Sequence, residues 1–469
     1  MISLLGAIAL LIGGLFSQQL FETTNWFPEG IRRFLRFTVL FWSLSALFFK
    51  VAPRYYVAAL GCIALLCTTY AVGVAPVFAI GLIVLASVIL GRRLFQGEWV
   101  LLFLSGIAII AFAIALFART PVHYPLVYFA ALLAILIYPP SQFRRHRYSL
   151  TALQSLTTAP AYWSLCLTLY LLTAHWLVVL KPEAGADALS MHLAIASDMA
   201  TRHAFTLDFP QFVWALMPMG ADFCYALAYI LGGEYAARIM NLVMLASIAY
   251  FIYQAVRAWL PQDTAFLVSA LFLSAPMVQL VTGTMMVENF VAAMVLGSAI
   301  ALWRFHEQPQ TSTLLICSLL LGTAIGWKIG AITLAVTLVP TLILSVFRNR
   351  SRLPNWRLSV TFAALLFLVP AVFPYATAYL RSGNPIYPFA NDTFHSPYLD
   401  EILEDSRFRE PLTALTLFYI TFQTNRFYEG QPGSFGFQYL VLIPFCLVAF
   451  PRMRSLAERS AVITGMVGA

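Results

Sequence analysis

The chain has 469 residues, of which 61% are hydrophobic and only 10% are charged. A soluble domain of this length needs far more charge to cover its surface, so the composition excludes a soluble globular protein. The net charge of +8 does not indicate a nucleic-acid partner, because the arginines lie in short loops between apolar runs, where the positive-inside rule places them.

Apolar runs recur along the whole chain. A helix needs roughly 20 apolar residues to cross about 30 Å of hydrocarbon. Because backbone polar groups in lipid must be satisfied within the segment, these runs are expected to be helices, and none alternates like a β-barrel strand. We predict an all-α polytopic membrane protein with roughly 13–15 transmembrane helices. The predicted spans are 2–16, 33–49, 55–72, 74–90, 99–118, 123–138, 161–180, 236–257, 263–281, 287–305, 312–326, 328–347, 357–379 and 436–450.

The orientation follows from the densest basic loop of the first half, which contains Arg144, Arg145 and Arg147. The positive-inside rule places this loop in the cytoplasm. Most acidic residues of the second half then lie in outward-facing segments, which supports the assignment. These segments are 181–235, 282–287, 326–328 and 380–435.

The acidic residues also divide the chain into two parts. Residues 1–150 contain almost none, and we predict that they form transmembrane helices of unknown role. Residues 151–469 are predicted to form a core with two long outer loops, 181–235 and 380–435. Residues 461–469 resemble the beginning of another span, so we expect the chain to be truncated there.

The first outer loop contains a helix-like stretch, 188–204, that mixes apolar and polar residues. This mixture is typical of a helix that lies in the membrane interface. Residues 221–232 are apolar but short, and the orientation requires that they do not cross. The second loop is rich in Pro, Asn, Gly and aromatic residues, which predicts an ordered loop.

The sequence contains no motif for binding a metal ion or a nucleotide. The six cysteines are scattered through apolar runs without the paired spacing of a metal site, and they are expected to be small core residues. No Walker lysine loop, dinucleotide glycine fingerprint or HExxH motif occurs. We therefore expect neither a cofactor nor a metal ion.

Two carboxylates and a histidine are candidate catalytic residues. Asp187 follows a predicted span, where a carboxylate can act as general base toward a hydroxyl, but it can also be a helix N-cap. Glu288 begins another span, where it either faces the helix dipole or is an expensive ionisable group retained for function. His192 is either a proton shuttle or simply hydrogen-bonded.

Three outward-facing cations are candidate ligands of an anionic substrate such as a lipid phosphate. Lys328 lies in a turn between two spans, although a lysine that snorkels to the interface is the alternative. Arg381 is the second cation, and Arg238 is weaker because it can pair with Glu234 four residues earlier. Asn384 lies in the turn-dense stretch after Arg381.

Several short motifs follow one another along the chain and lie on one predicted side of the membrane. Taken together, they resemble those of the integral-membrane GT-C glycosyltransferases. The likeness is to bacterial relatives of glycosyltransferase family 39, the protein mannosyltransferase type, and covers about residues 161–450. Two departures are that Ala188 stands where relatives have the second residue of an Asp-Glu pair, and that Glu288 stands where they often have aspartate. The motifs are Asp187-Ala-Leu-Ser-Met-His192-Leu, Pro218-Met-Gly220, Glu234-Tyr-Ala-Ala-Arg238, Glu288-Asn289, Lys328 between two glycines, and Ser382-Gly-Asn-Pro-Ile-Tyr-Pro388.

The resemblance implies a glycosyltransferase that moves a hexosyl or pentosyl group from a polyprenyl-phosphate donor to an acceptor hydroxyl. The reaction would invert the anomeric carbon at the outer face of the bacterial inner membrane. The implied partners are membrane lipid, the lipid-linked sugar, and a glycan, lipid or protein acceptor. Asp187 would be the base, with Glu288 and His192 as further catalytic candidates, and the substrate-binding candidates are Lys328, Arg238, Arg381 and Asn384.

Two other functions stay open. A lipid or glycan transporter or flippase needs ionisable residues along a path near the bilayer midplane, often in broken helices, whereas here the acidic residues cluster at one face. A polymerase or ligase of envelope polysaccharide would use the same outer-face site, and the sequence barely separates it from the leading hypothesis.

Overall fold

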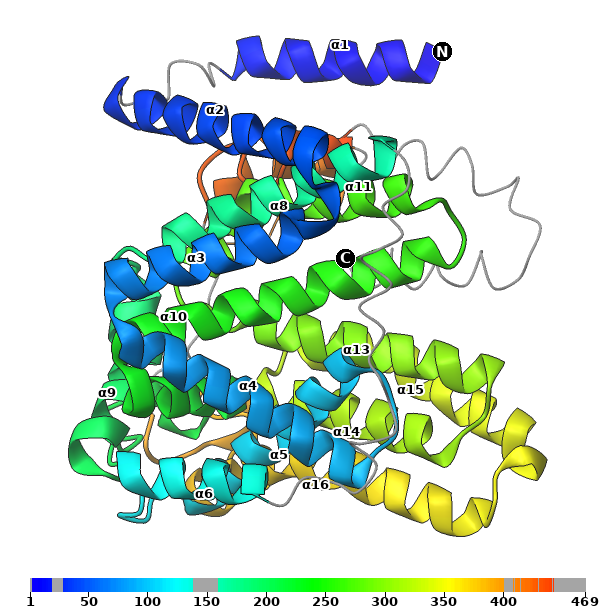
Figure 1. Cartoon of the computed structure of the whole chain (residues 1–469). Helices are drawn as coiled ribbons and strands as arrows, with labels where there is room; N and C mark the ends of the chain where they lie inside the picture. The colour runs from blue at the N-terminus through cyan, green and yellow to red at the C-terminus, as the bar shows by residue number, and fades with distance from the viewer. Residues whose placement is uncertain are drawn as a thin grey trace.

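The computed structural model describes residues 2–18, 28–137, 159–399, 408, 410–413, 415–428, 430–440 and 442. Within these ranges the chain forms helices joined by turns and contains no β-strand, which confirms the predicted all-α fold. Most helices lie roughly side by side in one bundle (Figure 1). A helix satisfies its own backbone hydrogen bonds, which is what a lipid environment demands.

The helices follow the predicted apolar runs. The first part of the chain contains α1 (Ile2–Ser17), α2 (Pro28–Val51), η1 (Pro53–Tyr55), α3 (Tyr56–Val72), α4 (Val74–Leu94), α5 (Trp99–Phe117) and α6 (Pro125–Ile137). The second part contains α8 (Ala159–Val179), η3 (Ala188–His192), α9 (Leu193–Arg202), η4 (Val213–Leu216), α10 (Gly220–Arg257), α11 (Gln262–Leu273), α12 (Pro276–Gly283), α13 (Glu288–Glu307), α14 (Thr311–Trp327), α15 (Ala331–Asn349), η5 (Arg350–Arg352), α16 (Trp356–Ser382), α17 (Asn391–Phe394), α18 (Thr416–Phe422) and η6 (Thr424–Arg426).

Among the described residues, nine helices are long and apolar enough to cross a membrane, or ten if the bent pair α11 and α12 counts as one span. The predicted number is larger partly because three further apolar helices are short. α1, α6 and α14 have 16, 13 and 17 residues. The last predicted span, 436–450, and the expected truncated span at 461–469 fall mostly or wholly outside the described residues.

The predicted span 263–281 is broken rather than continuous. α11 and α12 meet at an angle of 64°. The break occurs before Pro276, which lacks an N–H group and holds Ala275 in an extended conformation. The carbonyl of Leu273 at the break accepts a hydrogen bond of 2.9 Å from Nε2 of His175 on α8. A side chain of a neighbouring helix thus satisfies a backbone group that the bend would leave open.

The short apolar stretch 221–232 is the first segment of α10. Gly233 interrupts the helix with φ 75° and ψ −170°, a conformation that residues with a Cβ rarely adopt. α10 as a whole counts as one candidate span by length and composition, and the expectation that 221–232 does not cross stays a prediction.

The largest hydrophobic core joins α4 and α5 to α10, α13 and α14. α4 and α5 touch through their backbones, since a Cβ atom at Gly106 would stand 1.9 Å from the carbonyl oxygen of Ser87. Small residues of this kind allow the close packing that holds helices together in lipid. The core therefore contains residues from both sides of the predicted boundary at residue 150. The prediction that residues 1–150 and 151–469 have different roles stays a prediction.

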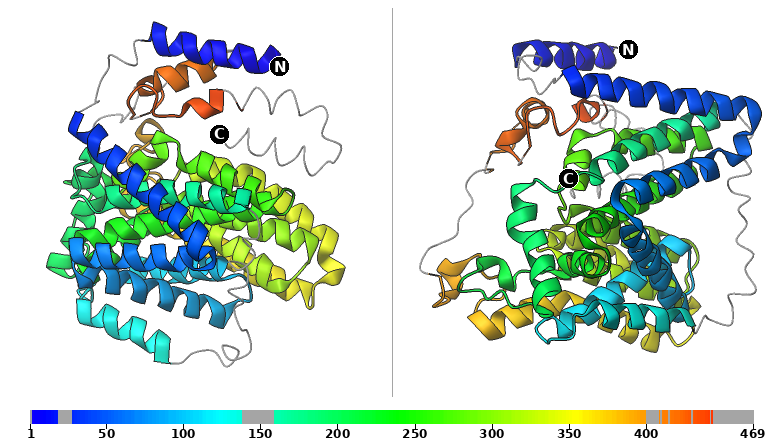
Figure 2. Two further views of the ribbon diagram at one scale, coloured as in Figure 1. Left: turned by 45° about the horizontal axis from the view of Figure 1, so that its top comes forward. Right: turned by 60° about the vertical axis from the view of Figure 1, so that its left-hand side comes forward.

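The first helices lie at one edge of the molecule. α2 and α3 contact α8 through a separate cluster that includes Phe41, Tyr56, Tyr162 and Tyr170. In Figure 1 and in the right-hand view of Figure 2, α1 and α2 (dark blue) lie far from α15 and α16 (yellow).

One end of the bundle, at the left of Figure 1, gathers the segments that contain the predicted site residues, and we call it the site end. The predicted helix at 188–204 is present as η3 followed by α9. The chain after α9 is attached to the turn between α5 and α6, because His123 N–H donates to the carbonyl of His203 (3.1 Å) and Phe205 N–H to that of Ala118 (2.7 Å). The turn between α15 and α16 lies at the opposite end.

Candidate functional site

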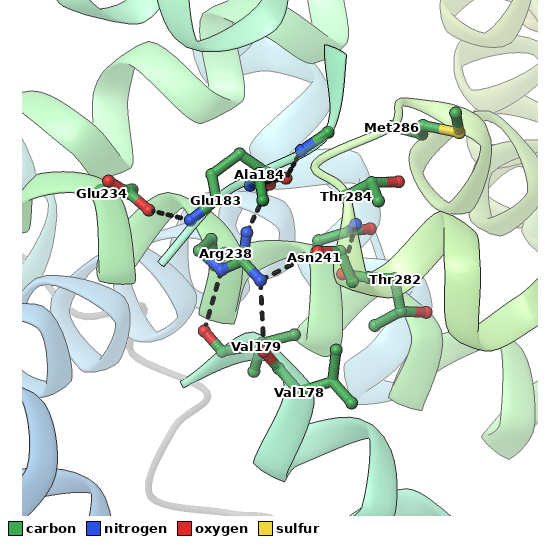
Figure 3. Close-up of polar contacts among 12 residues, drawn as sticks. Val178, Val179, Glu183, Ala184, Glu234, Arg238, Asn241, Thr282, Thr284 and Met286 are labelled. Atoms are coloured by element: carbon green, nitrogen blue, oxygen red, sulfur yellow. Dashed lines mark hydrogen bonds and ion pairs between the residues drawn. The ribbon is translucent and has the colours of Figure 1, made fainter. Parts of the chain in front are cut away.

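A buried ion pair holds the beginning of the first outer loop against the helix bundle (Figure 3). The guanidinium of Arg238 pairs with the carboxylate of Glu183, and both side chains are at most 2% exposed. Arg238 also donates to the carbonyls of Val179 (3.0 Å), Val178 (3.2 Å) and Gly283 (2.9 Å). A buried charge is tolerated when its hydrogen bonds are satisfied in this way. Arg238 therefore joins the end of α8 to the turn after α12.

The partner of Arg238 is not the residue expected from helical spacing. Glu234, four residues earlier, instead accepts a hydrogen bond of 2.6 Å from the backbone N–H of Glu183. Oε1 of Glu183 accepts from the N–H groups of Ala184 (2.9 Å) and Gly185 (2.8 Å). These bonds fix the chain immediately before Asp187. The geometry thus gives Arg238 a part in positioning this loop, and a contact with substrate stays a prediction.

The start of α13 is held by a second buried network. The amide of Asn289 donates to Oδ1 of Asn241 and to Oγ1 of Thr282, both at 3.0 Å. Asn241 donates in turn to the carbonyl of Val281 at 2.9 Å. Asn289 follows Glu288 directly, so this network sets the position of the Glu288 side chain at the helix start.

Two of the predicted site residues, Glu288 and Lys328, are in direct contact. Nζ of Lys328 lies 2.5 Å from Oε1 of Glu288, with the side chains 39% and 33% exposed. Glu288 is the first residue of α13, where a carboxylate faces the positive end of the helix dipole. Its other oxygen, Oε2, is buried and has no hydrogen-bond partner in the described part of the chain. The pair is therefore partly accessible to solvent, and one oxygen of its carboxylate lacks a hydrogen bond.

His192 contacts an aspartate that sequence reasoning missed. Nδ1 of His192 donates to Oδ1 of Asp222 at 2.6 Å, and both side chains are at least nine-tenths buried. Burial lowers the pKa of His192, but the charge and hydrogen bond of Asp222, with a contribution from Glu288, outweigh it and raise the pKa above its ordinary value. The only sequence signal for Asp222 is an ionisable residue inside an apolar run, which is uncommon in membrane helices.

The two pairs belong to one charged group, formed by His192, Asp222, Glu288 and Lys328. The charges of both Glu288 and Lys328 affect the pKa of His192. Tyr225, one turn after Asp222, donates to the carbonyl of Met286 at 2.8 Å, just before Glu288. With His192 protonated, the group contains two positive and two negative charges.

Asp187 is not a member of either pair. Its side chain is exposed, and within the described part of the chain this side chain makes no ion pair and no hydrogen bond. Its backbone is already helical, with φ −63° and ψ −40°, and its side chain does not cap η3, so the structure does not support the N-cap interpretation. Asp187 precedes His192 by one turn of the π-helix η3. A carboxylate without a protein partner is free to contact a substrate.

The remaining two predicted residues lie in and after the last turn of α16. Arg381 approaches Asp208 with a separation of 3.5 Å between Nη2 and Oδ1. Asn384 is fully buried and shapes its own loop, because its amide donates to the carbonyl of Phe389 (2.8 Å) and its oxygen accepts from Ile386 N–H (3.0 Å). A substrate contact of Asn384 stays a prediction.

Arg381 lines a cavity of about 240 Å³ between α5, α14 and α16. Its lining is mostly apolar, and its charged residues are Arg119 and Arg381. Gly220 and Trp327 also line it, and they lie two residues before Asp222 and one before Lys328. Among the described residues, no group of three or more His, Cys, Asp and Glu side chains is arranged to hold a metal ion.

Residues 217–373, about a third of the chain, match the family model described as dolichyl-phosphate-mannose-protein mannosyltransferase. No curated protein and no solved structure matches the chain significantly. The family match supports the resemblance to the GT-C superfamily that the motifs indicated. The matched segment contains Asp222, Arg238, Glu288 and Lys328, and it excludes Asp187, His192 and Arg381.

Proposed function

We propose that this protein transfers a sugar from a polyprenyl-phosphate donor to an acceptor hydroxyl at the site end of the bundle. The observation that carries the proposal is the charged group of His192, Asp222, Glu288 and Lys328. Phe223 and Trp327, the sequence neighbours of Asp222 and Lys328, line an apolar cavity. The family description, which names a dolichyl-phosphate-linked mannose, supports a lipid-phosphate donor.

The proposed reaction is an inverting substitution at the anomeric carbon. The acceptor oxygen forms the new glycosidic bond as the bond from the sugar to the phosphate oxygen breaks, and the phosphate leaves with the electron pair. Because a lipid phosphate is a good leaving group, the site needs to orient the reactants, accept one proton and stabilise negative charge. Nζ of Lys328 has three donors and Glu288 uses one of them, which leaves donors for a phosphate oxygen.

Asp187 is the proposed base. It is the carboxylate of the predicted set that has no protein partner in the described structure, so it can accept the hydroxyl proton without breaking an existing contact. Glu288 is the alternative base, with Oε2 unpartnered but Oε1 held by Lys328. His192 is held by Asp222, which raises the pKa of the imidazole, so its proposed role is to position the group rather than to act as the base.

The site end is the proposed outer face of a bacterial inner membrane. The opposite end contains Arg257, Arg304 and Arg348, all in the last turns of their helices, which agrees with the positive-inside rule. A lipid-linked donor presented on the outer leaflet would then reach the cavity from the lipid side.

One observation favours a second function, lipid transport. The bend of 64° between α11 and α12 is a broken span of the kind that transporters use for substrate sites. A transporter moves the lipid-linked sugar without chemical change, so the two functions differ in whether the sugar leaves the lipid.

The test is mass spectrometry of envelope glycans from a deletion strain complemented with the wild type, Asp187→Asn or Lys328→Gln. Loss of one sugar on deletion, restored by the wild type and not by Lys328→Gln, supports the transferase and identifies the sugar. An unchanged glycan profile on deletion would contradict it. If Asp187→Asn restores the sugar fully, Asp187 is not the base and Glu288 takes its place as the candidate.

A further inference from the structure

A single carboxylate lies between two arginines at the site end. Oδ1 of Asp208 is 3.5 Å from Nη2 of Arg381 and 4.0 Å from Nη1 of Arg119. Arg119 follows α5 and Arg381 lies in the last turn of α16, so the two cations come from helices far apart in the sequence. Asp208 belongs to the chain between α9 and η4. Both arginines line the apolar cavity, and Asp208 does not.

The chain around Asp208 covers both arginines with aromatic rings. The guanidinium of Arg119 lies 5.0 Å from the ring centre of Phe205, and that of Arg381 lies 5.7 Å from the ring centre of Phe209. Phe205 and Phe209 are buried, whereas Asp208 between them is half exposed. Residues 215–217 of the same chain form part of the cavity wall. We call residues 204–217 the cover segment.

The two arginines are poorly neutralised in this arrangement. Burial and the positive charge of Arg381 lower the pKa of Arg119, and Asp208 opposes this effect. Charge-assisted hydrogen bonds are about 2.7–2.9 Å long, so separations of 3.5 and 4.0 Å to Asp208 are loose contacts. Nη1 of Arg381 is buried and has no hydrogen-bond partner among the described residues. An anion with more oxygen atoms and more charge would bind here better than one carboxylate does.

We propose that Asp208 is a built-in competitor for the donor phosphate: it neutralises Arg119 and Arg381 while the site is empty, and the lipid phosphate displaces it. This inference rests on the proposed function for the chemical class of the ligand. Arg119 and Arg381 bind phosphate oxygens that Lys328 does not contact, and the isoprenoid chain lies in the apolar cavity. Displacement of Asp208 releases the electrostatic contact of the cover segment with the helix ends, so donor binding and movement of this segment are coupled.

The competing interpretation is that Asp208 only shapes its own turn. Its Oδ1 accepts from Phe209 N–H at 3.1 Å, and its carbonyl accepts from the N–H groups of Gln211 and Phe212. Asparagine retains the side-chain oxygen that accepts from Phe209 and removes only the charge. Asp208→Asn therefore separates the two interpretations without disturbing the turn.

The experiment measures binding of farnesyl phosphate and of farnesol to the full-length protein in lipid nanodiscs by native mass spectrometry. The two probes share the isoprenoid chain and differ in the phosphate. For the wild type we expect farnesyl phosphate to bind more tightly than farnesol. For Asp208→Asn we expect farnesyl phosphate to bind about two- to five-fold more tightly than to the wild type, because a partly exposed ion pair no longer competes. Farnesol binding should not change.

Two further variants make the result specific. Asp392→Asn removes an exposed carboxylate on α17 that contacts no cation in the described structure, and it should leave both affinities unchanged. Arg119→Gln should weaken farnesyl phosphate binding and leave farnesol binding as it is. If Asp208→Asn binds farnesyl phosphate no more tightly than Asp392→Asn does, the competitor proposal is wrong. If the wild type does not distinguish the two probes, the phosphate-donor part of the proposed function fails instead.

Discussion

The carboxylate of Glu288, the first residue of α13, lies 2.5 Å from the ammonium group of Lys328, the residue that follows α14. α13 begins and α14 ends at the same side of the bundle. Asn289 fixes the beginning of α13 through buried hydrogen bonds. The contact brings an acidic and a basic residue to the surface of a largely apolar protein. Its partial exposure distinguishes it from the buried pair of Arg238 and Glu183, which serves to hold the fold.

Lys328→Gln should lower kcat by about 10²- to 10³-fold, the usual loss when one donor to a developing negative charge is removed. The melting temperature should change little, since a partly exposed ion pair contributes about 0–1 kcal/mol to the free energy of unfolding. Lys181→Gln, at an exposed lysine of the same end, is the matched control. Transfer assays with thermal unfolding in detergent test this, and equal activity of both variants would exclude Lys328 from the mechanism.

Asp187→Asn should reduce transfer by about 10²- to 10⁴-fold, because the variant lacks the proposed general base. The side chain is exposed and has no partner in the described structure, so the variant should unfold at the same temperature as the wild type. Asp392→Asn provides the comparison for the loss of one exposed carboxylate. Should both variants retain full activity, the base is another residue and Glu288→Gln becomes the next variant to measure.

The pair of His192 and Asp222 should make stability depend on pH. Because Asp222 raises the pKa of His192 in the folded protein, the stabilisation is fully present below the ordinary histidine pKa of about 6.5. It is lost as pH rises through the raised pKa. The melting temperature of the wild type should therefore exceed that of His192→Gln by more at pH 6 than at pH 9. A difference that is constant over this range would show that the ion pair is not the source of the effect.

Glu183→Gln should strongly destabilise the protein, because it leaves the buried guanidinium of Arg238 without its counter-ion. Removing one partner of such a pair costs about 3–5 kcal/mol. The yield of monodisperse protein and the temperature of unfolding are the measurements. Glu29→Gln, which breaks an exposed pair with Arg33, is the control and should leave both unchanged. Equal behaviour of the two variants would mean that the Arg238 network does not stabilise the fold.

The sequence predicts the helical fold well, because lipid permits few alternatives for a long apolar run. Local breaks are harder to predict. The bend at Pro276 lies within the single predicted span 263–281, whereas the interruption at Gly233 falls between the short stretch 221–232 and the predicted span 236–257. At the bend, His175 of a neighbouring helix satisfies the opened backbone, a contact that the local sequence does not reveal.

The sequence singles out a charged residue most readily at a helix end. Glu288 and Lys328 are found in this way, and the structure places the two side chains in contact; their role in a site stays a prediction. Asp222 is missed because it lies inside an apolar run, and the true partner of Arg238 is missed because Glu183 is 55 residues distant whereas Glu234 is one helical turn away. Pairings between distant segments depend on helix packing, which helical spacing alone does not reveal.

The most direct test of the proposed transferase activity uses the donor that the cell itself supplies. A deletion strain that cannot consume its lipid-linked sugar should accumulate it, and the extracted lipid can be incubated with acceptor-containing envelope fractions and the purified protein in nanodiscs. Mass spectrometry should then detect loss of the sugar-lipid together with release of polyprenyl phosphate for the wild type, and at least 10²-fold slower release for Lys328→Gln. If the sugar-lipid persists unchanged with the wild-type protein, the chain does not catalyse the transfer.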